Sequence, residues 1–231
     1  MRAWIYDTWF APLTRGWYRA VLERIEPGSR LLDVGIGTGA ALAANGDLLA
    51  ERDLSVVGLD VDDHYLAQCR RRIEKRHLTD RVELLHQPVE EHAGGPYDAV
   101  YFSASFMLLP QPGRALEQVR GQLAADGKVF FTQTFESERS KLIEQVKPLL
   151  RHITTIEFGR VTYRDDFQQV LAGGGMEVVD EEKLNGGRKR HARLVVAQPV
   201  EAPARHGEAE PAAAESGDLA GELASAPGGA G

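Results

Sequence analysis

The sequence is poor in cysteine and lacks long apolar runs. Among its 231 residues Cys69 is the single cysteine, so no intrachain disulfide and no site with several cysteine ligands can form, and no metal site is expected. This usage is typical of a reduced compartment and favours a cytoplasmic location. Residues 1–13 are interrupted by Arg2 and Asp7, so they do not resemble a secretory signal. Because the apolar runs are short, we expect no stable membrane insertion.

Acidic residues are concentrated near the C-terminus. Residues 199–231 hold six acids and one arginine in a background of alanine, glycine and proline. Such a segment cannot offset its ordering entropy by burying apolar surface, so we expect it to be a disordered acidic tail. Residues 1–198 are then predicted to form one folded domain. Their nearly balanced charge gives no indication of a nucleic-acid partner.

Apolar runs bounded by turn residues alternate with helical patterns from residue 30 onward, which is typical of a parallel sheet with crossover helices. Strands are predicted at 30–34, 55–60, 82–86, 97–102, 128–134, 176–182 and 191–198, and helices at 16–25, 38–52, 63–75, 113–124 and 164–172. This order predicts an α/β fold with a Rossmann-like, doubly wound, seven-stranded sheet, mostly parallel with a C-terminal antiparallel hairpin strand. Residues 1–28 are expected to form an N-terminal lid and helix, and residues 136–163 a cap insertion.

Residues 31–40 place an apolar strand, a glycine-rich turn and the start of a helix in direct succession. The turn contains Gly35, Gly37 and Gly39. Glycines let the backbone approach a ligand, and free amides at a helix start face a negative group. The same spacing fits a dinucleotide pattern with Asp60 about 20 residues later, so the glycines leave two cofactors open. Asp33 favours a cofactor that carries an ammonium group, because a carboxylate so close to the turn can pair with it.

The segment Asp33-Val34-Gly35-Ile36-Gly37-Thr38-Gly39 resembles the first motif of the class I S-adenosylmethionine-dependent methyltransferases. Val57-Gly58-Leu59-Asp60 resembles the second strand of that family, whose terminal acid binds both ribose hydroxyls. Tyr97-Asp98-Ala99-Val100 resembles the opening of the fourth strand, and residues 164–179 resemble the last helix and sixth strand. The resemblance covers most of residues 1–198 and implies a methyltransferase with S-adenosyl-L-methionine as its cofactor.

The resemblance implies a set of cofactor-binding residues along the ends of the predicted strands. They are Asp33, Gly35, Gly37, Gly39, Asp60, Val61, Gln87, Val89 and Ser103. Two departures from the family stand out. Gln87-Pro88-Val89 occupies the place where related enzymes often have an Asp at the adenine, so Gln87 or the amide of Val89 is expected to take that contact. Ser103-Ala104-Ser105-Phe106 replaces the Asn-Pro-Pro-Tyr motif of many nucleic-acid and protein amine methyltransferases, which favours another acceptor class.

Four residues are candidates for the acceptor site. Tyr6 belongs to a Tyr-Asp pair that resembles the start of a lid in similar enzymes. Ser105 and Gln133 follow or end predicted strands, and Arg190 lies in a basic hairpin turn that could hold an anionic acceptor. Each also has an ordinary explanation as a packing residue, a local hydrogen-bonding group or a solvated charge. No catalytic residue is assigned, because a well-aligned nucleophile needs no dedicated base.

The predicted function is methyl transfer to a small-molecule acceptor. A phospholipid headgroup N-methyltransferase acting at the membrane surface is the alternative substrate class. An NAD-dependent oxidoreductase and a non-catalytic cofactor-binding partner subunit are also compatible with the glycine turn. The sequence leaves the methylated atom and the oligomeric state open.

Overall fold

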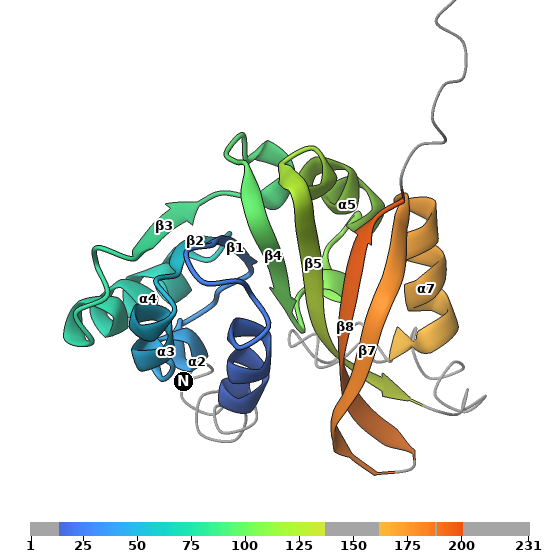
Figure 1. Ribbon diagram of the computed structural model, residues 1–231, viewed down its shortest axis with the longest axis horizontal. Coiled ribbons are helices and arrows are strands. Elements are labelled where there is room, and N and C mark those ends of the chain that lie inside the picture. Colours follow the sequence, from blue (N-terminus) through green and yellow to red (C-terminus); the bar gives the residue numbers. More distant parts are fainter. Residues whose placement is uncertain (1–13, 137–161, 188, 201–231) are drawn as a thin grey trace, which may run out of the picture. The chain divides into compact units, whose positions relative to one another are not determined.

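The computed structural model describes residues 14–136, 162–187 and 189–200. Their centre is one sheet with strand order β3-β2-β1-β4-β5-β8-β7, and a short strand β6 also pairs with β5 (Figure 1). The first five strands pair in parallel, whereas β8 is antiparallel to both β5 and β7. The predicted Rossmann-like, doubly wound α/β fold with a C-terminal antiparallel hairpin is therefore confirmed.

Strands β1 (Arg30–Val34), β2 (Ser55–Asp60) and β3 (Val82–His86) have their predicted bounds. The remaining long strands extend beyond the predicted ranges: β4 is Tyr97–Ser103, β5 is Leu123–Glu136, β7 is Met176–Gly186 and β8 is Arg190–Pro199.

The start of β5 corrects one expectation. The Asp126-Gly127 pair was expected to separate a helix over 113–124 from the strand, but Leu123 already pairs with Tyr97. The Asp-Gly pair lies within the irregular register between that contact and the pairing of Lys128 with Ala99. The helix ends earlier because the backbone of Gln122 is drawn into the sheet, where its carbonyl accepts the N–H of Tyr97 at 2.8 Å.

The helices are a segment over residues 14–22, then α2 (Ala40–Ala43), α3 (Gly46–Glu51), α4 (Asp63–Lys75), α5 (Pro112–Arg120) and α7 (Arg164–Gly173), with 3-10 turns η1 (Val89–Glu91) and η2 (Phe106–Leu108). The expectation of a single helix over 38–52 is wrong. Asn45 interrupts it: its buried side-chain amide donates to the carbonyls of Ala41 at 2.8 Å and Arg15 at 3.1 Å. An asparagine that bonds nearby backbone competes with continued helix.

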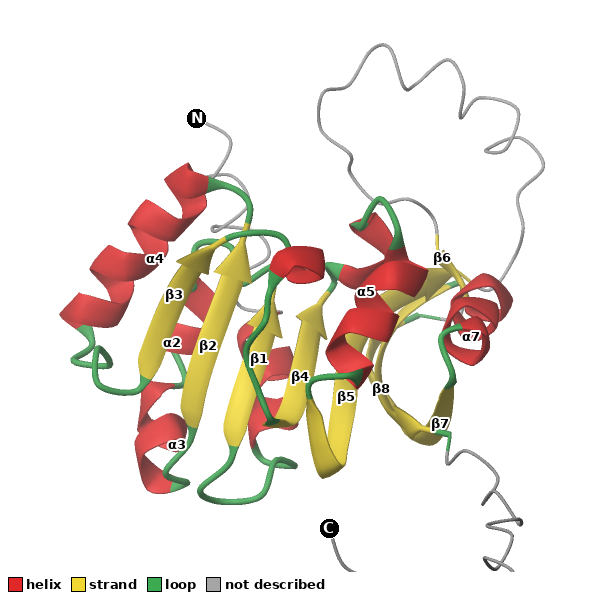
Figure 2. Ribbon diagram, turned by 90° about the horizontal axis from the view of Figure 1, so that it is seen from above, coloured by secondary structure: helices red, strands yellow, loops and turns green. Residues whose placement is uncertain are grey.

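Helices cover both faces of the sheet, as the view in Figure 2 shows. One apolar cluster joins the sheet to helix 14–22, α2, α3 and α4, and a second joins the opposite face to α5 and α7. Strands buried on both faces explain why β1 and β4 appear in the sequence as near-continuous apolar runs.

Five phenylalanines form the centre of the second cluster. They are Phe102, Phe106, Phe131, Phe135 and Phe167, each at most 1% exposed, with neighbouring ring centroids 4.9 to 5.7 Å apart. They come from β4, η2, β5 and α7. The cluster therefore fixes the turn after β4 against the end of β5 and the start of α7.

Several predicted segments lie partly or wholly outside the described residues. These are the lid residues 1–13, which include Tyr6, most of the cap insertion (137–161) and the tail from residue 201. Within the predicted lid region, residues 14–22 are helical and bury Trp17 and Tyr18. The described borders of the cap form strands, because β6 (Thr162–Tyr163), which was not predicted, pairs with Phe135 and Glu136.

At the far end of the domain, pairing runs slightly past the predicted boundary at residue 198. Strand β8 includes Pro199, and Val200 donates its N–H to the carbonyl of Gly175 at 2.9 Å. No helix in the described ranges is both long and apolar enough to span a bilayer.

We expect Phe131→Ala to lower the free energy of unfolding by about 3 to 5 kcal/mol, because it removes a buried ring that stacks on Phe102 and meets two further rings edge-on. Urea unfolding at neutral pH measures the change. Val179→Ala is the matched control, since Val179 is 44% exposed and its truncation should change stability by less than about 0.5 kcal/mol. Equal effects of the two substitutions would contradict the assigned core.

Candidate functional site

The turn between β1 and α2 is built by three glycines in the left-handed region. Gly35, Gly37 and Gly39 have φ values of 79°, 59° and 65°. The turn is tied to the neighbouring strand, because the N–H groups of Gly35 and Ile36 both donate to the carbonyl of Leu59, at 2.8 and 3.0 Å. Only glycine adopts this sequence of conformations without strain.

The three glycines differ in what a side chain would meet. A Cβ on Gly35 would lie 2.8 Å from the Cβ of Ser105, and one on Gly39 would collide with the thiol of Cys69. A Cβ on Gly37 would meet nothing within 4 Å. The outer glycines are therefore required for packing, whereas the middle one borders open space that a ligand can occupy.

Asp60, at the end of β2, connects the glycine turn to the following helix. One carboxylate oxygen accepts the N–H of Gly37 at 2.8 Å and the other accepts the N–H of Asp62 at 2.9 Å. Asp62 in turn caps α4 by accepting the N–H groups of His64 and Tyr65. Each oxygen of Asp60 keeps acceptor capacity for a further donor.

Val61 follows Asp60 with an apolar side chain in solvent. It is 67% exposed, the largest exposed fraction among the large apolar side chains of the described residues that lie at the surface. Its carbonyl is held at 3.0 Å from Nε2 of His86 at the end of β3. An apolar surface held beside the carboxylate of Asp60 suits a ligand that combines a flat apolar ring with hydroxyl groups.

Asp33 is a fully buried carboxyl group on β1. Its Oδ2 accepts the hydroxyl of Tyr18 at 2.9 Å, and its Oδ1 has no hydrogen-bond partner among the described residues. Burial raises the pKa of Asp33 to about 7, the bond from Tyr18 opposes that rise, and the charge of Asp60 adds to it. An ammonium group from a ligand would supply the partner that Oδ1 lacks.

The hydroxyl of Tyr18 belongs to a buried polar row between helix 14–22 and the sheet. The Tyr18 ring meets the Tyr101 ring edge-on, with centroids 4.9 Å apart, and the Tyr101 hydroxyl is 2.8 Å from the hydroxyl of Thr132. Burial raises the pKa of both tyrosines, so both stay protonated at neutral pH. The contact between Tyr18 and Asp33 was not predicted from the sequence, because no local pattern places a helix residue against a strand residue 15 positions later.

After β3 the chain forms a second buried polar group. The side-chain amide of Gln87 donates to Nδ1 of His92 at 2.6 Å, and Nε2 of His92 is 2.7 Å from the hydroxyl of Tyr97. Burial lowers the pKa of His92, which favours the neutral ring that these bonds require. The Gln87 amide nitrogen is thus engaged within the fold, and Val89 is buried beside it.

The turn after β4 carries Ser103, Ala104 and Ser105. Ala104 has a φ of 56°, a strained conformation for a residue with a side chain, and its N–H donates to the carbonyl of Thr132 at 2.8 Å. The hydroxyl of Ser105 donates to the carbonyl of Val34 at 2.6 Å. Ser105 therefore supports the glycine turn, while Ser103 is partly exposed at the strand end.

A hollow of about 300 Å³ lies beyond the carboxyl end of β5. It is lined by Phe135, Glu136, Tyr163, Arg164, Asp165, His191 and Arg193. Burial, followed by the charges of Arg193 and Lys183, lowers the pKa of His191, so its ring is neutral at pH 7. Sequence reasoning pointed to the basic turn near Arg190 but missed Glu136, Tyr163 and Asp165, which meet here only because β6 pairs with β5.

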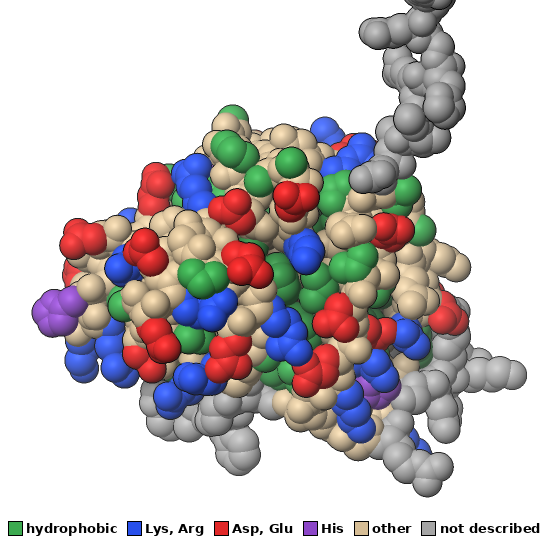
Figure 3. All heavy atoms as spheres, viewed as in Figure 1, with side chains coloured by type: hydrophobic (Ala, Val, Ile, Leu, Met, Phe, Trp, Pro, Cys, Tyr) green, Lys and Arg blue, Asp and Glu red, His purple; other side chains and the backbone are tan. Residues whose placement is uncertain are grey.

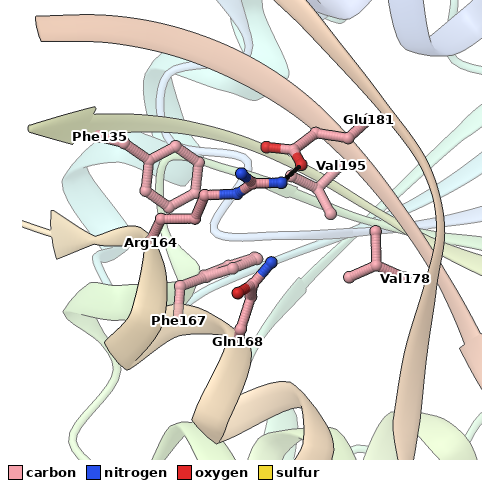
Figure 4. Close-up of a pocket in the computed structure, with 7 residues that line it drawn as sticks. All are labelled: Phe135, Arg164, Phe167, Gln168, Val178, Glu181 and Val195. Atoms are coloured by element: carbon pink, nitrogen blue, oxygen red, sulfur yellow. Dashed lines mark hydrogen bonds and ion pairs between the residues drawn. The ribbon is translucent and has the colours of Figure 1, made fainter. Parts of the chain in front are cut away.

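A carboxylate next to the hollow positions its two arginines. Figure 4 shows Glu181 reaching from β7 to the guanidinium of Arg164, with which it forms an ion pair. Its other oxygen lies 3.1 Å from Nη1 of Arg193. In Figure 3, acidic, basic and histidine side chains mix over the part of the surface where Figure 1, in the same view, shows the lower part of β7 and β8. This composition favours a polar ligand that carries groups of both signs.

The remaining acceptor candidates are separated by the fold. Gln133 is buried on β5 and donates to the hydroxyl of Thr162 at 3.0 Å. Arg190 begins β8 opposite Glu136 and is exposed. Gln133 and Arg190 therefore lie next to residues that line the hollow, while Ser105 lies at the glycine turn.

Comparisons with known proteins show which sequences and folds this chain resembles. Residues 32–129 match the family model described as a methyltransferase domain. The chain is 25% identical over 188 residues to a phosphatidylethanolamine N-methyltransferase from Cereibacter sphaeroides, an alignment that covers 79% of this chain and 88% of the relative.

Solved structures share the fold at low sequence identity. A geranyl diphosphate methyltransferase in complex with S-adenosylmethionine superposes with a TM-score of 0.63 at 13% identity, over 80% of this chain and 85% of the other. The 4+2 cyclase SpnF superposes with a TM-score of 0.63 at 17% identity, over 82% and 81%. The matched segment spans β1 with its glycine turn, the acid that ends β2, and the strands up to β5. Residues 32–129 therefore belong to a methyltransferase domain, and the fold around them is the one found in S-adenosylmethionine-dependent methyltransferases.

Proposed function

We propose that this enzyme transfers the methyl group of S-adenosylmethionine to a small polar acceptor bound in the hollow beyond β5. The volume of that hollow, about 300 Å³, is the observation that carries the proposal, since it lies in the range of small-ligand sites. In the sheet, β4 alone separates β5 from β1, so the hollow and the glycine turn lie at the same carboxyl edge.

The cofactor is proposed to lie across the ends of β1, β2 and β4. Asp33 would pair with the ammonium group of the cofactor. The backbone of the turn at Gly35, Gly37 and Gly39 would contact the cofactor, and Asp60 would accept hydrogen bonds from its ribose hydroxyls. Val61 would pack on the adenine ring, with Gln87, Val89 and Ser103 completing the rim. The open space at Gly37 and the unpartnered oxygen of Asp33 support this placement.

When bound, the cofactor supplies an activated methyl group on a sulfonium. The contribution of the chain is to align the acceptor with that methyl group and to exclude water, which can provide much of the rate acceleration. Glu136 and Asp165 would hold a positive end of the acceptor, and Arg193 a negative end. The neutral ring of His191 can accept a proton from an acceptor amine.

A phospholipid headgroup is the second candidate acceptor. The alignment with phosphatidylethanolamine N-methyltransferase favours it, because it extends over most of both chains. An ethanolamine phosphate group carries charges of both signs, as the lining of the hollow would require. The two candidates therefore differ in whether the acceptor is presented in solution or by a membrane.

Formation of S-adenosylhomocysteine distinguishes the candidates. We expect turnover with a set of soluble amines and zwitterionic metabolite-sized acceptors in the absence of lipid. Turnover only with vesicles that contain phosphatidylethanolamine would contradict the soluble acceptor and support the headgroup. Calorimetric titration with NADH is the accompanying control, and tight NADH binding would contradict the cofactor assignment.

Asp60→Ala should weaken cofactor binding at least about tenfold, because hydrogen bonds to a carboxylate contribute about 1.5 to 3 kcal/mol each. Isothermal titration calorimetry with S-adenosylhomocysteine measures the affinity. Asp63→Ala is the matched control: it removes an exposed acid three positions later and should leave affinity within about twofold. Unchanged affinity in a folded Asp60→Ala protein would contradict the ribose contact.

Substitutions at Gly37 and Gly39 should have different effects. Gly37→Ala should reduce cofactor affinity at least about tenfold, because its Cβ enters the open space, while the positive φ costs about 1 to 2 kcal/mol of stability. Gly39→Ala should destabilise the protein more, because its Cβ collides with Cys69. Thermal melting and calorimetry separate the two effects. If Gly37→Ala binds normally, the turn has only a structural role.

A further inference from the structure

We propose that Tyr18 is a positioning residue of the cofactor site, which holds Asp33 so that the ammonium group of the cofactor replaces a proton on that carboxyl group when it binds. The inference rests on the placement of Asp33 proposed above. It adds a residue from helix 14–22 to a site otherwise formed by the strand ends.

The two carboxyl oxygens of Asp33 differ in their hydrogen bonding. Oδ2 accepts the hydroxyl of Tyr18 at 2.9 Å, whereas Oδ1 is buried without a partner among the described residues. A buried anion with one unpaired oxygen is unfavourable until a cation arrives. The hydroxyl of Tyr18 cannot supply that cation, but it keeps the carboxyl group in one orientation and favours its ionised form.

Burial raises the pKa of the described tyrosine and cysteine side chains around Asp33. Tyr18 from helix 14–22 and Tyr101 from β4 have raised pKa values through burial. Burial likewise raises the pKa of Cys69 on α4 to about 12. Among the described residues, Asp60 at the end of β2 is a further neighbour, and its negative charge raises the pKa of Asp33 in addition to burial.

Arg72 on α4 is a cation that is hydrogen-bonded to the glycine turn. Arg72 donates to the carbonyl of Thr38 at 2.7 Å, and its charge lowers the pKa of Cys69 without removing the effect of burial. Arg72 therefore fixes the backbone of the glycine turn. The ammonium group of the cofactor is left to neutralise Asp33.

Binding is then linked to pH with a definite sign. Below a pKa of about 7 the free protein carries a proton on Asp33, and pairing with the ammonium group releases that proton to solvent. Affinity should fall about tenfold for each pH unit below that value and pass through a maximum above it. At higher pH the ligand loses the proton of its own amine, which lowers the affinity of each variant that retains Asp33.

Tyr18→Phe keeps the buried ring and removes the hydroxyl. Without that hydrogen bond the pKa of Asp33 rises further. The decrease in affinity toward low pH should therefore begin about one pH unit higher than in the wild type. Calorimetry with S-adenosylhomocysteine from pH 5.5 to 9 would then show a loss of about tenfold at pH 6 and of less than about threefold at pH 8.5.

Two matched variants define the comparison. Tyr101→Phe also removes a buried hydroxyl, but this hydroxyl is bonded to Thr132 and not to Asp33. The affinity of this variant should therefore fall at low pH over the same range as that of the wild type. Asp33→Asn should bind weakly, with no such fall in affinity at low pH. If Asp33→Asn binds like the wild type, the proposed cofactor placement fails. If it binds weakly and Tyr18→Phe loses affinity equally at every pH, or not at all, only the role of Tyr18 fails.

A measurement on the wild-type protein tests the proton exchange without any substitution. Titrations at pH 6 in two buffers of different ionisation enthalpy count the protons released when S-adenosylhomocysteine binds. About one proton per ligand is expected, because Asp33 is almost fully protonated at that pH. Binding at pH 6 with no proton release would overturn the exchange, whatever the stability of the Tyr18 variant.

Discussion

The attachment of the glycine turn to the end of β2 is the constraint on which the site depends. The carbonyl of Leu59 accepts two turn amides, and the carboxylate of Asp60 accepts a third from Gly37. These bonds place the backbone of the glycine turn next to the carboxylate of Asp60 and the exposed apolar side chain of Val61. Because β1 lies between β2 and β4, any ligand held by the turn lies against the ends of all three strands.

Asp33 and Asp60 differ in burial and in hydrogen bonding. Asp60 is partly exposed and satisfied by backbone amides, whereas Asp33 is enclosed and has a raised pKa. The two carboxyl groups therefore suit different parts of one ligand, hydroxyl groups at the first and a cation at the second. Helix 14–22 contributes to this division through Tyr18, whose hydroxyl donates to Asp33.

The opposite end of the sheet is organised by antiparallel pairing. Strand β8 inserts between β5 and β7, so side chains from late in the sequence line a hollow at the carboxyl end of β5. Glu181 holds Arg164 and Arg193 on its border. The fold is shared with methyltransferases and a cyclase, and in the proposed function these side chains select the acceptor.

Local patterns in the sequence determined the order of strands and helices, the glycine turn and the acid after β2, because these depend on short-range periodicity and backbone conformation. The break at Asn45, the bulge at Asp126-Gly127 and the strand β6 depended on partners distant in sequence, which local propensity does not report. The site divides in the same way. Asp33 and Gly37 were found from their motif, whereas the bond from Tyr18 and the meeting of Glu136, Tyr163 and His191 exist only because tertiary packing brings separate elements together.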